Sequence, residues 1–241
     1  SNSGRFEIVD AGINSEYSDY GSSFFGDKLV FASARDTGGV SKNIFKWNNQ
    51  SFTNLYASKI GLDNNLEAPK RFDNKINSKF HESTPVFTKD GKTMYFTRNN
   101  FLDGKRGKDS KSVTLLKMYK STLVDGQWAN IAELPFNSDN YSVAHPALSL
   151  DEKTLYFASD MPGTLGQSDL FKVTINENGT YSTPENLGAK INTEGRETFP
   201  TISAENELYF ASDGRPGLGG LDIYVTRLDQ NQNIGEIQNI G

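Results

Sequence analysis

The sequence of 241 residues contains no cysteine, only two histidines and no long apolar run. Without cysteine the chain cannot build a disulfide framework, a zinc ribbon or a thiol nucleophile, although an oxidising compartment would tolerate such a chain. No apolar stretch approaches the roughly 18 residues that a membrane-spanning helix needs. The first residue is serine and no signal peptide is present, so we expect a mature or excised fragment.

Basic charge is also scarce, because the formal net charge is −5. A nucleic-acid-binding domain needs a basic face, so nucleic acid is not an expected partner. The chain is rich in glycine, with 22 residues, and 12% of its residues are aromatic. This composition favours a strand-rich fold with many tight turns.

One short phrase occurs four times at similar spacing. Two bulky apolar residues are followed by a pair of small or polar ones at residues 30–33, 95–98, 156–159 and 209–212. A proline lies about eleven residues before the last three copies, as Pro85, Pro146 and Pro200, and Tyr20-Gly21 stand there in the first. Self-similarity at a period above fifty residues indicates a repeat architecture.

Each repeat contains four short strand signals, which we call strands a, b, c and d. Short runs of Val, Ile, Tyr and Phe are bounded by Gly, Asp, Asn and Pro, and the a–b connections ("FGDK", "TKDGK", "SLDEK", "SAENE") have turn chemistry. Four antiparallel strands per repeat predict an all-β fold, a β-propeller of four-stranded blades. The approximate blade limits are 14–76, 77–136, 137–191 and 192–241, with residues 5–13 as an extra d-type strand. Either four blades close the propeller or it continues beyond Gly241. We favour a larger propeller of about five or six blades.

Three longer phrases resemble a known family. They are "NSEYSDYGSSFFGDKLVFASARDTGG", "TPVFTKDGKTMYFTRNN…DGKRGKD" and "GLGGLDIY", and they are similar to the WD-like propeller of OmpA-family proteins from Bacteroidota. The resemblance implies a periplasmic protein associated with the outer membrane, often a lipoprotein, in type IX secretion and gliding machinery. It implies an outer-membrane barrel partner of the PorP/SprF kind. The family's helical and peptidoglycan-binding OmpA regions do not occur in these residues, and its propeller has no established catalytic residues.

Two long b–c connections, residues 35–54 and 99–115, must leave the same face on adjacent blades, because antiparallel strands alternate their connections between two faces. Long loops on a rigid scaffold often carry function. The first is expected to form a hairpin and offers interface anchors that local packing would explain equally: Ile44, Phe45, Trp47 and Phe52. The second is a basic loop, which would suit an acidic partner or lipid head groups or would simply be solvated; it carries Lys105, Arg106, Lys108 and Lys111.

Polar residues just before or at strand a are expected at the channel mouth on this same face. They are candidates for binding a peptide, glycan or peptidoglycan fragment, with a structural role in the d–a connection as the alternative: His81, Glu82, Ser83, His145, Arg196 and Glu197. The asparagines of the recurring "IN(S/T)" phrase are interpreted as turn-formers: Asn14, Asn77, Asn137 and Asn192.

No catalytic motif stands out. There is no G-x-S-x-G phrase, and "HESTP" at 81 is not H-E-x-x-H. Asp169 and Asp222 recur at the start of strand c, which favours turn stabilisation over calcium ligation. Glu82 and Glu197 would have to pair across the axis to serve glycoside hydrolysis. We therefore expect no enzyme, no cofactor and no metal, but a scaffold that links an outer-membrane or adhesin partner to a peptidoglycan-binding domain outside this chain.

Overall fold

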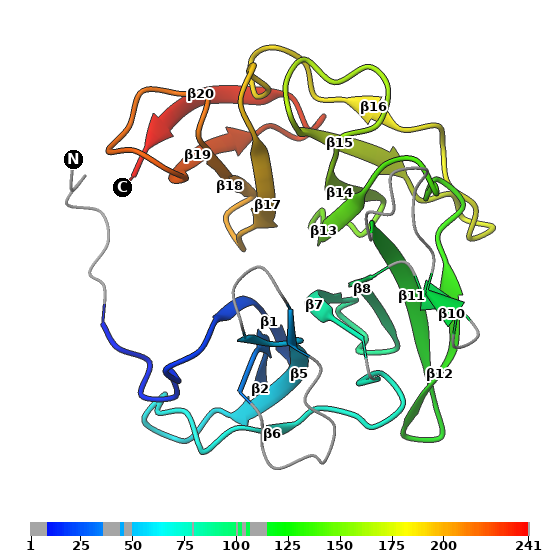
Figure 1. Cartoon of the computed structure of the whole chain (residues 1–241). Helices are drawn as coiled ribbons and strands as arrows, with labels where there is room; N and C mark the ends of the chain where they lie inside the picture. Colours follow the sequence, from blue (N-terminus) through cyan, green and yellow to red (C-terminus); the bar gives the residue numbers. More distant parts are fainter. Residues whose placement is uncertain are drawn as a thin grey trace. The chain divides into compact units, whose positions relative to one another are not determined.

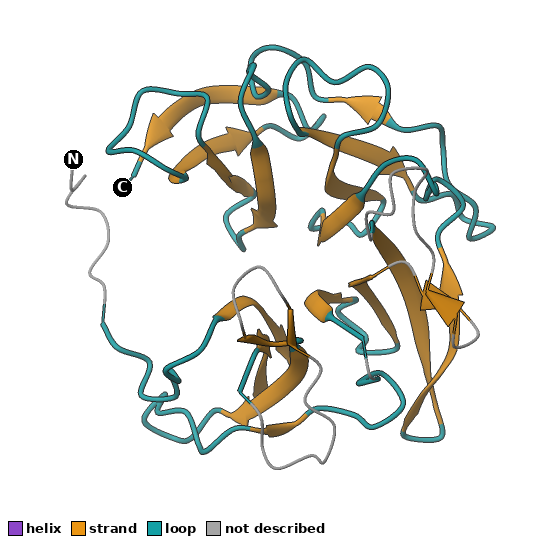
Figure 2. Cartoon of the chain, in the orientation of Figure 1, coloured by secondary structure: helices purple, strands orange, loops and turns teal. Residues whose placement is uncertain are grey.

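The structure is a computed structural model. It describes residues 9–35, 44–45, 50–78, 80–99, 101–102, 105–106 and 115–240, and side chains for residues 9–35, 52–78, 80–99 and 115–240. The described residues form four antiparallel four-stranded sheets, and Figure 2 draws no helix among them. The sheets are propeller blades, so the predicted all-β propeller fold is confirmed. Within the described ranges, no helix is long and apolar enough to cross a bilayer.

Each blade takes its four strands in chain order (Figure 1). Blade 1 consists of β1 (Asp19–Phe25), β2 (Lys28–Ser33), β5 (Asn54–Lys59) and β6 (Lys70–Arg71). Blade 2 consists of β7 (Glu82–Phe87), β8 (Thr93–Asn99), β11 (Leu116–Val124) and β12 (Gln127–Glu133). Blade 3 consists of β13 (Val143–Leu148), β14 (Thr154–Ser159), β15 (Asp169–Thr174) and β16 (Glu185–Asn186). Blade 4 consists of β17 (Glu197–Ile202), β18 (Glu207–Ser212), β19 (Asp222–Leu228) and β20 (Ile234–Asn239).

Two further hairpins interrupt the b–c connections of blades 1 and 2. The first pairs β3 (Ile44–Phe45) with β4 (Gln50–Ser51), and the second pairs β9 (Phe101–Leu102) with β10 (Lys105–Arg106). Each hairpin is a separate two-stranded sheet rather than an extension of its blade. At the amino-terminal end, residues 9–13 form no strand, and residues 5–8 of the proposed extra strand lie outside the described residues.

The described residues fall into two compact units, 9–134 with blades 1 and 2, and 135–240 with blades 3 and 4. Each unit has its core between its two blades. In the first unit Val30 and Leu55 of blade 1 pack with Phe96 and Tyr119 of blade 2. In the second unit the core between blades 3 and 4 has an equivalent composition: Tyr156, Leu170, Leu208, Phe210 and Tyr224.

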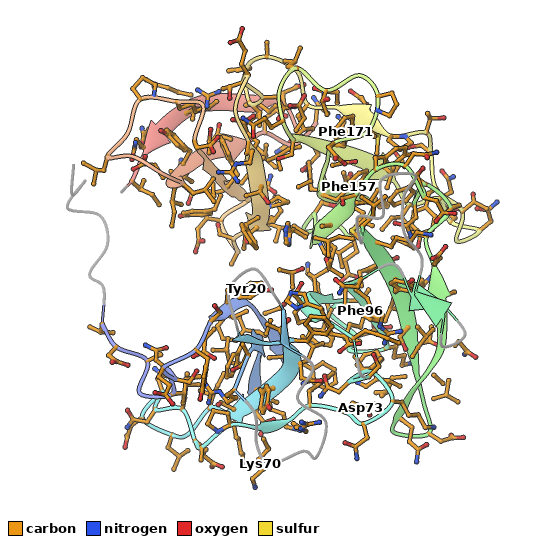
Figure 3. The ribbon with its side chains drawn as sticks, viewed as in Figure 1. Tyr20, Lys70, Asp73, Phe96, Phe157 and Phe171 are labelled. Carbon is orange, nitrogen blue, oxygen red and sulfur yellow. The ribbon has the colours of Figure 1, made fainter. Side chains whose placement is uncertain are left out.

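The second strand of each blade explains why the "YFAS" phrase is almost wholly apolar. In β8 and β14 every residue after the first is buried, so successive side chains are covered on both faces of the sheet. Phe157 stacks on Phe171 of the neighbouring strand, with ring centroids 6.0 Å apart (Figure 3). Full burial of one such side chain contributes about 1.5–3 kcal/mol, so the repeated phrase supplies much of the stability of each blade.

Candidate functional site: the starts of the first strands and the b–c connections

A buried carboxylate opens the first strand in three of the four blades. Asp19, Glu82 and Glu197 each accept a hydrogen bond from the serine or threonine four residues earlier. We call this arrangement the carboxylate cap. It joins the strand to the preceding "IN(S/T)" phrase, so the chain's approach to each blade is fixed by local hydrogen bonds.

A guanidinium group completes each cap from a different backbone position. Arg35 donates to the carbonyl of Ile13 at 2.6 Å, Arg98 to that of Ile76 at 2.8 Å, and Arg215 to that of Ile191 at 3.0 Å. Arg35 and Arg98 also pair with the carboxylates of Asp19 and Glu82. The three arginines lie over aromatic rings of their own blades, which adds cation–π attraction.

Blade 3 has an apolar version of the same arrangement. Val143, three residues before Pro146, stands where Glu82 precedes Pro85 and is fully buried. Phe136 replaces the isoleucine and stacks on Phe157 with ring centroids 5.0 Å apart. One repeat therefore folds without the charges, which identifies the caps of the other three blades as structural features.

Glu82 is the most deeply buried of these carboxylates that shows a raised pKa. Its Oε1 accepts from Ser78 and from Nε of Arg98 at 3.0 Å, while Oε2 is buried without a hydrogen-bond partner. Burial raises the pKa of Glu82 to about 7, and Arg98 opposes that rise. Because the side chain has no exposed surface, it does not face an open channel.

Glu197 and Arg196 are likewise occupied by contacts within blade 4. Glu197 is fully buried and accepts from Thr193 and from Oγ of Ser212 at 2.5 Å. Arg196 pairs with Asp213 at 2.8 Å on the surface. Their predicted ligand role stays a prediction, and the contacts of both residues correspond to the structural alternative.

His81 lies between blades 1 and 2. Its Nδ1 accepts from the backbone N–H of Thr53 at 3.2 Å, and its Nε2 is 3.1 Å from the hydroxyl of Tyr20 on β1. Burial lowers the pKa of His81 to about 4. The bond from Thr53 requires an unprotonated Nδ1, so both the geometry and the burial favour a neutral ring.

A repeated bulge in the first strand was not anticipated from the sequence. The residue before each proline or its counterpart Ser22 has a left-handed backbone: Gly21 (φ 63°), Thr84 (φ 44°), His145 (φ 60°) and Phe199 (φ 51°). The strand pairing shifts register at each of these positions. The sequence signal was the constant place of these residues before the proline, which is tolerated at bulges and on edge strands.

These bulge residues meet across neighbouring blades within each unit. In the second unit the half-buried rings of His145 and Phe199 lie 4.1 Å apart. In the first unit Gly21 lies against Thr84. Left-handed residues other than glycine cost free energy and often occur at functional sites. Of the predicted channel-mouth residues, His145 is therefore the one for which the structure adds a new feature.

The predicted interface residues of the b–c connections are only partly described. Phe52 is half-buried, and its ring meets that of His81 edge-on at 5.9 Å, which matches the local-packing alternative. Ile44 and Phe45 lie in β3, and Lys105 and Arg106 in β10, whose backbones alone are described. Trp47, Lys108 and Lys111 lie outside the described residues.

The two short b–c connections are organised by the aspartate that opens strand c. Asp169 accepts from the backbone N–H of Leu165 at 2.8 Å and from Asn186 at 2.7 Å. Asp222 accepts from the N–H of Leu218 at 3.0 Å. Both are buried and serve the turn before them. Among the described residues, no group of three or more acidic or histidine side chains is arranged to hold a metal ion.

Two of the recurring asparagines bind the preceding blade rather than only their own turn. Asn77 accepts from the N–H of Leu55 at 2.7 Å and donates to its carbonyl at 2.8 Å. Asn192 does the same to Leu170, at 2.8 and 3.0 Å. We call this contact the asparagine lock. It replaces a strand-to-strand pairing at the start of strand c and joins successive blades.

Comparison with known proteins agrees on the fold and goes no further. No family model and no curated protein sequence matches the chain. Among solved structures, TolB from Acinetobacter baumannii matches 94% of this chain and 44% of its own, with 15% identity and a TM-score of 0.51. A putative TolB from Agrobacterium tumefaciens (16% identity, 90% and 61% of the two chains, TM-score 0.50) is also similar. So is an α-L-arabinofuranosidase from Fusarium graminearum (14%, 90% and 64%, TM-score 0.54). At these identities the likeness defines the class, a β-propeller, and membership of the OmpA family stays a prediction.

Proposed function

We propose that this propeller is a non-catalytic interaction scaffold of the bacterial periplasm. It docks through its b–c connections on an outer-membrane β-barrel of the PorP/SprF kind or another secretion or adhesin component. A peptidoglycan-binding domain outside these residues would link that complex to the cell wall. The OmpA-type resemblance in the sequence motivates the compartment, the type IX secretion and gliding context and the partner.

The observation that carries the proposal is the division of labour between the blades and their connections. The charged groups that catalysis would use, Glu82, Glu197 and Arg98, are held in buried caps inside the blades. Blades 3 and 4 have compact b–c turns, whereas blades 1 and 2 insert the additional hairpins β3–β4 and β9–β10 there. Rigid blades with extended connections are a common way to present a contact surface.

The test exchanges a long connection for a short one from the same chain. Residues 34–53 would be replaced with residues 160–168 of blade 3, which bridge the same two strands. We expect the purified variant to lose at least about tenfold in affinity for the purified barrel in nanodiscs, measured by biolayer interferometry. The matched control replaces the exposed c–d turn residues Leu62 and Asp63 with serine. Equal affinity of wild type and graft, with unchanged circular dichroism, would contradict the proposal.

A ligand-binding propeller is the second candidate, favoured by the paired rings of His145 and Phe199. A half-buried ring pair held by strained backbone suits stacking against a peptide or glycan. Because Glu82 and Glu197 are buried in caps, their removal would damage the fold rather than test binding. His145→Gly suits the left-handed backbone and removes the ring. Muropeptide binding by calorimetry, lost in this variant, would support the candidate, and no heat with the wild type would remove it.

A further inference from the structure

The asparagine lock has two halves, and blade 4 carries one of them without an observed counterpart. In blades 1 and 3 the receiving residues Leu55 and Leu170 pair with the alanine of the "FAS" phrase and are fully buried. Ile223 occupies the same place in blade 4, pairing with Ala211, and its carbonyl accepts from Ile240 as that of Leu55 accepts from Phe72. Yet Ile223 is 47% exposed.

The surroundings of Ile223 are open in the same way. Tyr209 and Ala211 are partly exposed, whereas the equivalent Tyr156 and Ala158 of blade 3 are buried in the core with blade 4. A hollow of about 320 Å³ lies on the same sheet, lined by residues of β18, β19 and β20 that include Glu207, Val225 and Arg227. Leu218 and Leu221, in the turn just before β19, are also exposed. We call this the receiving face.

Blade 1 carries the inserting half. In blades 2 and 4 this half consists of a buried isoleucine, the locking asparagine and an apolar residue at the end of the first strand, Phe87 or Ile202, in the inter-blade core. Blade 1 has Ile13 and Asn14 in the same phrase, and its carboxylate cap with Asp19 and Arg35 is formed.

The contacts of this third half differ from those of the other two. Asn14 is exposed, and its side chain donates to Asp10 at 3.2 Å instead of to a strand. Phe24, which pairs with Leu29 as Phe87 pairs with Met94, is 71% exposed, whereas Phe87 is 9% exposed. We call Asn14, Phe24 and Ile13 the inserting face.

We propose that the receiving face of blade 4 binds the inserting face of blade 1 of a second copy of this chain. The two observed junctions define what the receiving face requires: an isoleucine, an asparagine whose amide reaches the Ile223 peptide group, and an apolar side chain beside them. The inserting face offers all three, and one chain carries both complementary faces. Such a contact is head-to-tail, so it allows dimers and longer assemblies.

Disulfide trapping tests the contact directly, because the chain contains no cysteine. Asn14→Cys and Ile223→Cys would be purified separately, mixed and oxidised. We expect a covalent heterodimer in the mixture, well above the yield obtained when Leu62→Cys, an exposed position, replaces either partner. A yield no higher than with Leu62→Cys would overturn the proposal.

Sedimentation velocity of the unmodified chain gives an independent measurement. We expect association between about 1 and 100 µM, weakened at least about tenfold by Phe24→Asp or Ile223→Asp and unaffected by Leu62→Asp. Circular dichroism of each variant would verify that the blades remain folded. A chain that stays monomeric over this range would overturn the proposal and assign the two faces to repeats of another polypeptide.

Discussion

The side-chain amide of Asn77 pairs with both the N–H and the carbonyl of Leu55, 22 residues earlier in the chain. The amide thus acts as a short piece of strand, which satisfies two buried backbone groups at the start of β5. Because Asn77 belongs to the approach to blade 2 and Leu55 to blade 1, one side chain joins two blades. Its neighbour Ile76 is fully buried in the core between them.

Replacing Asn77 with alanine should lower the free energy of unfolding by about 2–4 kcal/mol, since two buried backbone groups lose their partner. Asn77→Asp should also destabilise, because a carboxylate cannot donate to the Leu55 carbonyl. Urea denaturation followed by circular dichroism would measure both. Asn14→Ala is the matched control at low protein concentration and should change stability by no more than about 0.5 kcal/mol. A loss equal to that of the control would refute the lock's role.

The bulge of β1 should be sensitive to a single added methyl group. An ideal Cβ on Gly21 would lie 2.5 Å from Cγ2 and 3.2 Å from Cα of Thr84, and φ is 63°. Gly26 has a similar φ of 57° but nothing within 4 Å of such a Cβ. Gly26→Ala should therefore cost about 1–2 kcal/mol for the backbone alone. Gly21→Ala should cost a further 1–3 kcal/mol, roughly, for the crowding.

Thermal and urea unfolding of these two variants would separate the two effects. The difference between them reports the contact between the first strands of blades 1 and 2. If both alanine variants lost the same stability, the close approach of Gly21 and Thr84 would be wrong.

Glu82 should make the stability of the first unit depend on pH. Burial raises its pKa from 4.5 to about 7 in the folded protein. Its contribution is fully present below pH 4.5 and is lost as the pH rises through 7, because ionisation in the folded state carries the desolvation cost. Glu82→Gln should be less stable than the wild type at low pH relative to its standing at pH 8. The measurement is the difference in unfolding free energy between the two proteins at matched pH, so other carboxylates cancel; a pH-independent difference would contradict the raised pKa.

His81 should act in the opposite direction. Burial lowers its pKa from 6.5 to about 4, so its contribution is present above pH 6.5 and is lost as the pH falls through 4. His81→Asn keeps an acceptor for the Thr53 N–H but cannot be protonated in this range. Between pH 6.5 and 4 the wild type should therefore lose stability relative to this variant. Nuclear magnetic resonance of the ring protons would give the pKa itself, and a value near 6.5 would disprove the burial effect.

Periodic features of the sequence were enough to predict the blades. The phrase "LYFAS" recurs because a strand covered on both faces needs apolar side chains in succession, and Pro, Gly, Asp and Asn mark the turns between strands. The interpretation of Asp169 as a turn-forming residue follows the same local logic, because its partners lie within a few residues. Local chemistry of this kind is written directly in the chain.

Long-range partners were beyond such reasoning. Glu82 and Glu197 look like paired carboxylates in the sequence, but each is used by the serine or threonine four residues before it and by groups of the neighbouring strand. The left-handed backbone of Thr84, His145 and Phe199 leaves no trace in residue type, because threonine and phenylalanine disfavour it. Burial and strand register produce these features, and both depend on what packs on the strand.

The sequence by itself determined the repeat, the four strands of each blade and the turns that separate them, because these depend on periodicity and on neighbouring residues. Only the tertiary structure decided that Asn77 and Asn192 bind the preceding blade, that the carboxylates are capped and buried, and that Ile223 and Phe24 are exposed where their counterparts are covered. The physical reason is that side chains repeated at the same place in each blade differ in function only through the neighbour that covers them.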